Sequence, residues 1–397
     1  MRPRIWAAMA VLAVAATATL GAFIADDGPA GPSPHSGPAS GGPRHTAVTV
    51  SPGSCGRGWT GSRSGTQVFD LRNTSTGPAE VDLMDPETGA VYGEVEGLAP
   101  GTVREMRVAL GGGSYAFRCL PDDADAVTGP TVRVFGRAAG GPHAVPVTAH
   151  DLVEPALAYQ RWVGARTVEL ARRTDVLRKA VDSGDLDAAR KAWLPAHLVY
   201  ERMGAAYGTF GDSDAVINGS GAGLPKGIHD RDFQGFHRLE YGLWHGESAA
   251  ALRAPAGRLA QAVHALRDGW PQQRMDPADL GLRAHEILEN TEQFELTGRT
   301  DHGSGTGLAT ARANLDGTRE LLSVLRPLLT SRYPALPRLD SWLDRTQRTL
   351  DASDHGGRWT PVGRLSRADR ERLNSDIGEA VERLSSVAAI CDLRRTA

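Results

Sequence analysis

The sequence has few of the features that mark several common classes of protein. Its 397 residues include 44 Lys and Arg and 47 Asp and Glu, which gives a formal net charge of -3. This balance offers no basic footprint for nucleic acid, so we expect no nucleic-acid partner. No segment reads His-Glu-x-x-His, nor the inverse pattern in which a histidine directly follows the glutamate. The zinc sites of the common metalloproteases are therefore not expected.

The N-terminus combines a short basic start with an apolar run. Met-Arg-Pro-Arg precedes an uncharged segment from Ile5 to Ala25 that is rich in Ala, Val and Leu, the layout of a secretory signal. An uncleaved membrane anchor is the alternative for residues 1–25, because a membrane-spanning helix needs roughly 20 apolar residues. Both interpretations predict an extracytoplasmic protein, at the cell surface, in the periplasm or secreted. Residues 26–45 are polar and rich in Pro and Gly, which indicates a flexible linker.

Cysteine is scarce, with only Cys55, Cys119 and Cys391 in the chain. No cysteine follows the apolar run before Cys55, so a lipid attachment site at the end of that run is not expected. An exported protein can form disulfides. We expect Cys55 to pair with Cys119, near the first and late strands of one predicted domain, and Cys391 to stay unpaired. A different pairing is left open.

Residues 46–137 predict a small β-sandwich. Short alternating runs such as 67–71 and 103–110 are separated by clusters of turn-forming residues. There is no histidine between His45 and His143, whereas a blue-copper centre needs two imidazoles and a cysteine thiolate. We therefore expect no type-1 copper in this domain.

From residue 150 to 390 the apolar residues recur with the period of a helix. Ala189, Trp193 and Ala196, for example, fall on one helical stripe. Helices are predicted at about 152–182, 186–207, 231–246, 256–269, 277–297, 306–331, 335–353 and 366–388. The chain is thus expected to be a multi-domain protein, with an all-β sandwich followed by an all-α helical bundle.

Three predicted helices carry a histidine and a carboxylate at helical spacing. His237 and Glu240 are three apart, while His197 and Glu201, and His285 and Glu289, are four apart. Residues at these spacings share one helix face, and helix bundles build metal sites from such pairs. Asp212 and Asp214 follow the second helix and add oxygen ligands nearby.

The same pairs also occur as separate surface ion pairs with neighbouring arginines, and the pattern alone does not choose between the two interpretations. His302 has no partner at such a spacing and is expected at the surface.

Four segments in the second domain also resemble a known family, the EfeO-type members of the imelysin-like proteins. The segments are Trp193-Leu194-Pro195-Ala196-His197 with Glu201, Phe210-Gly211-Asp212-Ser213-Asp214, Gly235-Phe236-His237-Arg238-Leu239-Glu240 and His285-Glu286-Ile287-Leu288-Glu289. The resemblance spans about residues 150–390, and its hallmark is Gly-x-His-x-x-Glu. It implies a helical metal-binding domain preceded by a cupredoxin-like β-domain.

This resemblance also implies a function. Its members are exported iron-binding components that pass ferric or ferrous iron to an EfeU-type membrane permease, with an EfeB-type haem peroxidase as partner. His237 and Glu240 are the firmest ligands that the resemblance implies, followed by Glu201 and an aspartate of the 212/214 pair. His197, His285 and Glu289 are added from helix geometry. Such ligands also suit Zn2+ in vitro, so iron comes from the resemblance and not from the spacing.

Two alternatives belong to other classes of protein. Imelysin-like proteins have been grouped with metallopeptidases because of their His-x-x-Glu element, although Tyr241 stands where the inverse zinc motif needs a histidine. An anionic-polysaccharide-binding protein is the other alternative, since several helices carry arginine-rich faces. We expect no enzymatic activity.

Overall fold

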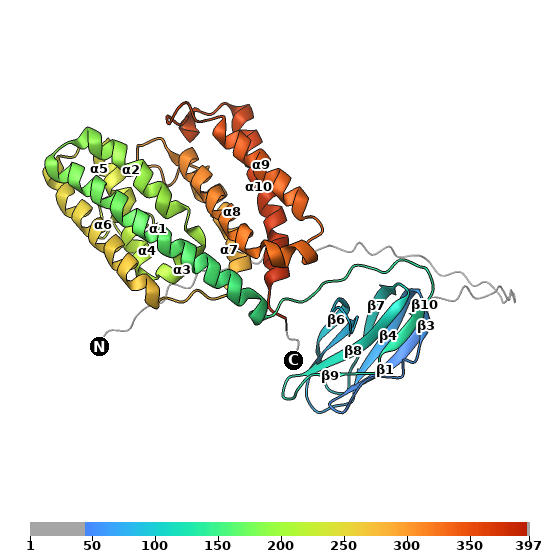
Figure 1. The fold of residues 1–397 in the computed structure, drawn as a ribbon. Coiled ribbons are helices and arrows are strands. Elements are labelled where there is room, and N and C mark those ends of the chain that lie inside the picture. The colour runs from blue at the N-terminus through green and yellow to red at the C-terminus, as the bar shows by residue number, and fades with distance from the viewer. Residues whose placement is uncertain (1–43, 395–397) are drawn as a thin grey trace, which may run out of the picture. The chain divides into compact units, whose positions relative to one another are not determined.

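The computed structural model describes residues 44–394 and divides them into a β-region followed by a helical region (Figure 1). This confirms the predicted fold class. The predicted signal or anchor at 1–25 and nearly all of the linker at 26–45 lie outside the described residues. Within the described residues, no helix is both long enough and apolar enough to cross a membrane.

The β-region forms two sheets. Its strands are β1 (His45–Ser51), β2 (Ser54–Arg57), β3 (Ser62–Arg63), β4 (Gly65–Asn73), β5 (Ala79–Met84), β6 (Val91–Leu98), β7 (Val103–Leu110), β8 (Gly113–Pro121), β9 (Val127–Thr128) and β10 (Val132–Phe135). One sheet has the order β2-β1-β4-β7, and the other has the order β3-β10-β8-β5-β6 with β9 beside β8. The pairs β1–β4 and β3–β10 are parallel, and the remaining pairs are antiparallel.

The core of this sandwich lies between the two sheets, and a disulfide bond connects the sheets across it. Apolar residues that alternate along the strands, such as Phe69 of β4 and Leu83 of β5, are fully buried. Cys55 of β2 and Cys119 of β8 form a disulfide with a Cα–Cα distance of 5.8 Å, so the bond joins the two sheets. The predicted pairing is therefore confirmed, and Cys391 stays free and buried.

The helical region begins after residue 148. Its helices are α1 (Ala149–Ser183), α2 (Leu186–Glu201), α3 (Tyr207–Phe210), α4 (Asp212–Asn218), α5 (Gly235–Trp244), α6 (Ala249–Gly269), α7 (Asp279–Asn290), α8 (Gly307–Arg332), α9 (Leu336–Asp351) and α10 (Arg367–Cys391). Short 3-10 turns are η1 (Gly204–Ala206), η2 (Gly227–His229), η3 (Trp270–Gln272) and η5 (Val362–Arg364), and η4 (Thr291–Glu295) is one turn of π-helix.

Helix α8 lies at the centre of the helical region. It packs against α1 and α2, and also against α7 and α9, while α6 covers another side of α1 and α10 packs on α7 and α9 (Figure 1). Its buried face includes Leu308, Leu315, Leu322 and Leu329, spaced by seven residues. This spacing places one continuous apolar stripe between the two groups of helices.

Two predicted helices are shorter than expected. The predicted helix 186–207 ends at Glu201, and Asp212 to Asn218 form the separate helix α4. The turn η1 and the short helix α3 lie between α2 and α4, and Gly211 separates α3 from α4 because its φ of 57° and ψ of -132° lie outside the helical region and favour glycine. The predicted helix 277–297 remains α-helical only to Asn290 and then widens into the π turn η4.

The disulfide yields a stability prediction. The double substitution Cys55→Ala/Cys119→Ala opens a loop that closes across 64 residues of sequence. We expect it to lower the unfolding free energy of the β-domain by about 4 kcal/mol, since the unfolded chain regains the freedom that the bond removes. Urea unfolding of the full chain, followed by far-UV circular dichroism, measures this. Cys391→Ala is the control, and an equal loss in both variants would contradict the prediction.

Candidate metal centre

Helix α2 supplies one histidine–carboxylate pair to the bundle interior. His197 and Glu201 are both buried, although most charged residues lie at protein surfaces. Their Nε2 and Oε1 atoms are 2.8 Å apart. Asn218 of α4 completes the pair, because its amide Nδ2 donates to Glu201 Oε1 at 2.7 Å and its Oδ1 lies 3.1 Å from His197 Nε2. A polar triangle thus connects α2 with α4.

Helix α5 supplies the second pair. Gly235, at its first position, has a φ of 82°, and a Cβ atom there would lie 2.2 Å from the carbonyl oxygen of Ile217 in α4. Only glycine allows that approach, which brings α5 against α4. His237 and Glu240 follow within the next turn, both buried, with Nδ1 and Oε2 3.6 Å apart. The glycine of Gly-x-His-x-x-Glu therefore positions the two side chains that follow it.

A loop between η4 and α8 holds the carboxylate of Glu240. The backbone N–H groups of His302 and Ser304 donate to Glu240 Oε1, each at 3.1 Å. The Ser304 hydroxyl donates to the same oxygen at 2.5 Å. Asp301 folds the loop by accepting from the N–H groups of Gly303 and Gly305 at 2.8 and 3.1 Å. Glu240 Oε2 is left to face His237.

The π turn η4 adds a third carboxylate. Wider than an α-helical turn, it ends at Glu295, which is 8% exposed. The hydroxyl of Thr300 donates to Glu295 Oε2 at 2.7 Å. The sequence analysis did not predict Glu295 as a ligand. In a continuous α-helix the face that carries His285 and Glu289 continues to Glu292, whereas the π turn changes the register after Asn290.

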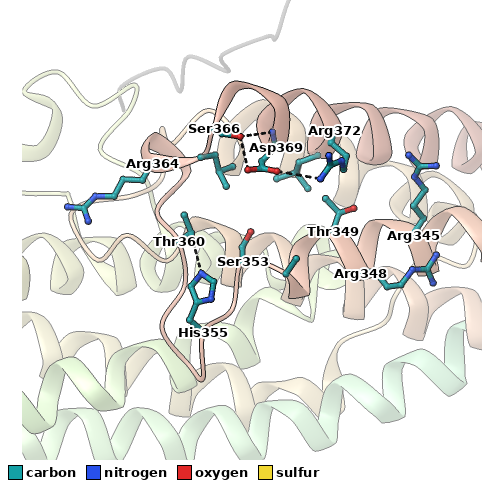
Figure 2. A pocket seen from close by; sticks show the side chains of 13 residues that line it. Arg345, Arg348, Thr349, Ser353, His355, Thr360, Arg364, Ser366, Asp369 and Arg372 are labelled. Atoms are coloured by element: carbon teal, nitrogen blue, oxygen red, sulfur yellow. Dashed lines mark hydrogen bonds and ion pairs between the residues drawn. The ribbon is translucent and has the colours of Figure 1, made fainter.

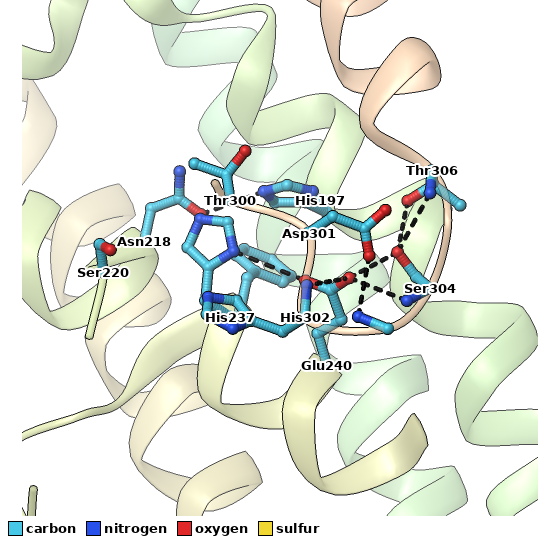
Figure 3. Close-up of polar contacts among 12 residues, drawn as sticks. His197, Asn218, Ser220, His237, Glu240, Thr300, Asp301, His302, Ser304 and Thr306 are labelled. Atoms are coloured by element: carbon cyan, nitrogen blue, oxygen red, sulfur yellow. Dashed lines mark hydrogen bonds and ion pairs between the residues drawn. The ribbon is translucent and has the colours of Figure 1, made fainter. Parts of the chain in front are cut away.

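Several of these side chains line one small cavity. Figure 3 shows His197, His237 and Glu240 beside the loop that contains Asp301 and Ser304, and Glu295 also belongs to the lining. The volume is about 10 Å³, near the lower limit for one water molecule or one ion. The rings of His197 and His237 are 5.4 Å apart, centroid to centroid, and His302 stands 5.4 Å from His237 on the other side. His302 was expected at the surface, and this expectation is wrong.

Three buried ring nitrogens of this cluster have no hydrogen-bond partner among the described residues. They are Nδ1 of His197, Nδ1 of His237 and Nε2 of His302. An unsatisfied buried polar group costs on the order of 1–3 kcal/mol, so several together call for a physical reason. A neutral imidazole nitrogen is also a good ligand for Fe, Zn or Mn, and the neighbouring carboxylates supply oxygen ligands.

Burial and neighbouring groups shift the pKa values of the cluster in opposite directions. Burial alone would lower the pKa of His197, but the carboxylate of Glu201 outweighs burial and raises it. Burial would raise the pKa of Glu201 and of Glu240, yet the histidines, with Asn218 and Ser304, lower both. Glu295 has no such partner strong enough, and burial raises its pKa to about 8. Glu201 and Glu240 are therefore ionised at neutral pH, while Glu295 holds a proton.

The other predicted ligands lie farther from the cavity. Asp214 accepts a short hydrogen bond from the Tyr200 hydroxyl, and burial raises its pKa. Asp212 is exposed. His285 and Glu289 pair with each other, with Nδ1 and Oε2 3.5 Å apart and side chains 21% and 43% exposed. The expected contribution of these two to a shared interior is thus not found.

The cluster is not a closed coordination shell. In residues 44–394, the sets of three His, Cys, Asp or Glu side chains whose ligand atoms all lie within 4.8 Å of one another belong to the β-sandwich: His45, Asp70 and Glu105, and Glu80, Asp82 and Glu94. In the helical cluster, side chains must rotate before three of them can reach one ion.

Comparison with known proteins places the helical region in a family. The family model of imelysin, a group named among the M75 peptidases, matches residues 156–390, which is more than half of the chain. The chain belongs to the imelysin family. All the cluster residues described above lie within the matched segment. The β-sandwich lies outside it, so imelysin membership concerns the helical region.

Relatives that match a longer part of the chain than the family model does are described as iron uptake system components EfeO. The protein of Yersinia pestis is 26% identical over 332 residues, covering 83% of this chain and 86% of that protein. The protein of Escherichia coli K12 is 24% identical over 332 residues, covering 83% and 87%. A crystal structure described as an iron-regulated protein A precursor from Parabacteroides distasonis aligns with 61% of this chain and 93% of that chain, at a TM-score of 0.44 and 14% identity.

The raised pKa of Glu295 predicts how the stability of this imelysin-family domain depends on pH. Burial raises that pKa from 4.5 to about 8, so between these values the native state holds a proton that the unfolded state has lost. The contribution of Glu295 is fully present below the lower value and is lost as the pH rises through the upper one. In metal-free protein, Glu295→Gln should reduce the fall in unfolding free energy between about pH 5 and about pH 8.

Urea unfolding at several pH values measures that slope. Glu289→Gln is the matched control, because Glu289 lies on the same helical segment with its side chain 43% exposed. If Glu295→Gln and Glu289→Gln keep the slope of the unaltered chain, the buried carboxylate of Glu295 is ionised in the native state and the prediction is wrong.

Proposed function

We propose that this protein binds iron as cargo in the helical domain and serves in a bacterial iron-uptake system outside the cytoplasmic membrane. The relatives from Yersinia pestis and Escherichia coli, described as iron uptake system components, support this assignment over most of the chain. The proposed ligands are His197, Glu201, His237, Glu240 and Glu295. Asp214 is proposed as a nearby carboxylate that orients Tyr200 and does not contact the metal.

One observation carries the proposal. His197 of α2 and the pair His237 and Glu240 of α5 line one small cavity, and each of the two histidines has a buried ring nitrogen without a hydrogen-bond partner. His264 also has a partner at Nε2, the Asp175 carboxylate at 3.0 Å, but its side chain is 35% exposed and does not leave an unpartnered nitrogen buried, as His197 and His237 do. Burying imidazole nitrogens without hydrogen-bond partners costs free energy, and coordination of a cation would offset that cost.

The ligand set suits iron in either oxidation state. Carboxylate oxygens are hard ligands that favour Fe3+, and imidazoles add affinity for Fe2+ and for Zn2+. The protonated Glu295 makes the cluster adaptable, because a cation that enters can displace its proton and gain a third carboxylate. We therefore propose iron as the physiological cargo and Zn2+ as a competitor in vitro.

A binding function is favoured over peptidase activity. A metallopeptidase needs an open metal position and a carboxylate that is free to act as a general base. Glu240 Oε1 accepts three hydrogen bonds from the loop at His302 and Ser304, which lowers its basicity. The pKa of Glu201 is likewise lowered by His197. Both carboxylates are thus better suited to hold a cation than to accept a proton from water.

The rest of the system is proposed from the same relatives. An EfeU-type permease would receive the iron, with an EfeB-type haem peroxidase as a further partner. The N-terminal segment 1–25 would direct export or anchor the chain, and the β-sandwich would serve as a cupredoxin-like module. Its disulfide uses both cysteines, so no thiolate is left there for a type-1 copper centre.

Metal titration of the full chain tests the proposed site. We expect iron to bind the unaltered protein, and His237→Ala/Glu240→Ala to weaken binding by more than about 100-fold, since two ligands are removed from a buried site. Isothermal titration calorimetry with Fe2+ under anaerobic conditions and with ferric citrate measures the affinity. Zn2+ provides a third titration.

The matched control is His264→Ala/Asp175→Ala. This pair joins α6 and α1 at the surface, with the two side chains 35% and 41% exposed, so its removal should leave metal binding unchanged. Circular dichroism of both variants excludes unfolding as the cause. Equal affinity in the two double variants would show that the metal binds elsewhere, and hydrolysis of an unstructured protein such as casein would reopen the peptidase alternative.

A further inference from the structure

A larger cavity lies away from the metal cluster, where α9 meets the start of α10. Its volume is about 430 Å³, within the range of small-molecule sites. Side chains from α9, from the connection that follows it and from the first turn of α10 line it (Figure 2). None of the five proposed metal ligands belongs to this lining. It is therefore a separate feature of the helical domain.

The lining has a strong excess of positive charge. Four arginines belong to the lining, Arg345, Arg348, Arg364 and Arg372, against a single acidic residue, Asp369. Figure 2 shows Arg364 at one end of the cavity and Arg345 and Arg348 at the other, with Arg372 beside Asp369. Guanidinium groups arranged around a concave space are the usual recognition elements for carboxylate and phosphate.

Internal ion pairs account for only part of this charge. Arg345 donates to the buried carboxylate of Asp376 at 2.7 Å, and Arg372 lies 3.4 Å from Asp369. Among the described residues, Arg348 and Arg364 form no ion pair. Both side chains are exposed to solvent, so their charges are available to an anion that enters the cavity.

The helix ends do not supply the missing charge. The cavity lies beside the C-terminal end of α9, whose partial negative charge favours Arg348 in the last turn. It also lies at the N-terminal end of α10, where Ser366 is the cap and the partial charge is positive. These two effects oppose each other, so they leave the excess of guanidinium groups uncompensated.

Neutral hydrogen-bonding groups complete the lining. The hydroxyls of Thr349, Ser353 and Thr360 face the cavity, and His355 lies 3.2 Å from Thr360 Oγ1 through its Nε2. Hydroxyl and imidazole N–H groups can also donate to anionic oxygens, more weakly than arginine does, and they add direction to the electrostatic attraction. The chemistry of the cavity is thus that of a polar anion site.

We propose that this cavity binds a small multivalent anion, one that carries several carboxylate or phosphate groups. Such an anion can engage guanidinium groups at both ends of the cavity at once, which a chloride ion cannot do. A volume of about 430 Å³ admits a tricarboxylate the size of citrate as well as inorganic phosphate. The site is independent of the proposed iron site, because the two share no lining residue.

Calorimetric titration of the metal-free full chain with citrate and, separately, with phosphate tests this. We expect at least one of the two anions to bind, with an affinity that falls as sodium chloride is raised. Arg348→Gln/Arg364→Gln should weaken that binding by about tenfold or more, since each charge-assisted hydrogen bond to an anion contributes strongly. Binding of citrate alone or of phosphate alone identifies the preferred anion and supports the site equally.

The matched control is Arg178→Gln/Arg338→Gln, which removes the same charge at two exposed arginines of α1 and α9 outside the cavity. The proposal is overturned if neither anion binds, or if the cavity variant and the control variant bind with the same affinity. Neither result bears on the iron site, which is tested by His237→Ala/Glu240→Ala. All four substituted arginines are exposed, so the variants are expected to fold.

Discussion

The burial of ionised carboxylates is the constraint on which the helical domain depends. A carboxylate that leaves water loses several kcal/mol of solvation, and it stays ionised inside a protein only where charged or hydrogen-bonding partners replace the water. Glu201 and Glu240 are almost fully buried, so each needs such partners from more than one helix. Glu201 takes them from α2 and α4, and Glu240 takes them from α5 and the loop before α8. The two carboxylates thus connect α2 with α4 and α5 with the loop before α8.

Aromatic packing makes this constraint stricter. The ring of His197 lies 4.7 Å from that of Trp193 and 5.2 Å from that of Phe236, centroid to centroid. The Trp193 indole N–H donates to the carbonyl oxygen of Phe236 at 2.9 Å, which joins α2 to α5 on the apolar side of the cluster. Surroundings of low polarity strengthen each electrostatic interaction and also raise the cost of each unpaired polar group. The aromatic packing around the cluster therefore makes complete hydrogen bonding of its buried polar groups more important for stability.

The sequence predicts those parts of the cluster that lie on regular helices. His197 with Glu201 and His237 with Glu240 are visible because a helix places residues three and four apart on one face. The same rule misleads at His285 and Glu289, since spacing shows that two side chains share a face but not whether that face is buried. Periodicity cannot reveal Glu295, because the π turn shifts it from the expected helical register.

The loop that binds Glu240 could not be predicted from the sequence, for a different reason. His302 and Ser304 contribute backbone N–H groups, which nearly every residue type has, so the residue types do not reveal this contact. The several glycines around Asp301 indicate a turn in this part of the sequence. They do not indicate which side chain the backbone of that turn binds. Order of domains, strand positions and the disulfide could be read from alternation, composition and cysteine location, since these are local properties of the chain.

The arrangement of charge in the cluster bears on how a cation could enter and leave. The carboxylate of Glu201 helps to raise the pKa of His197 against the effect of burial, and burial raises the pKa of Glu295 to about 8. A cation that reached these side chains would compete with protons for them, since a carboxylate binds a metal in its ionised form and an imidazole binds it in its neutral form. Binding of a cation in this cluster would therefore release protons and would weaken as the pH falls.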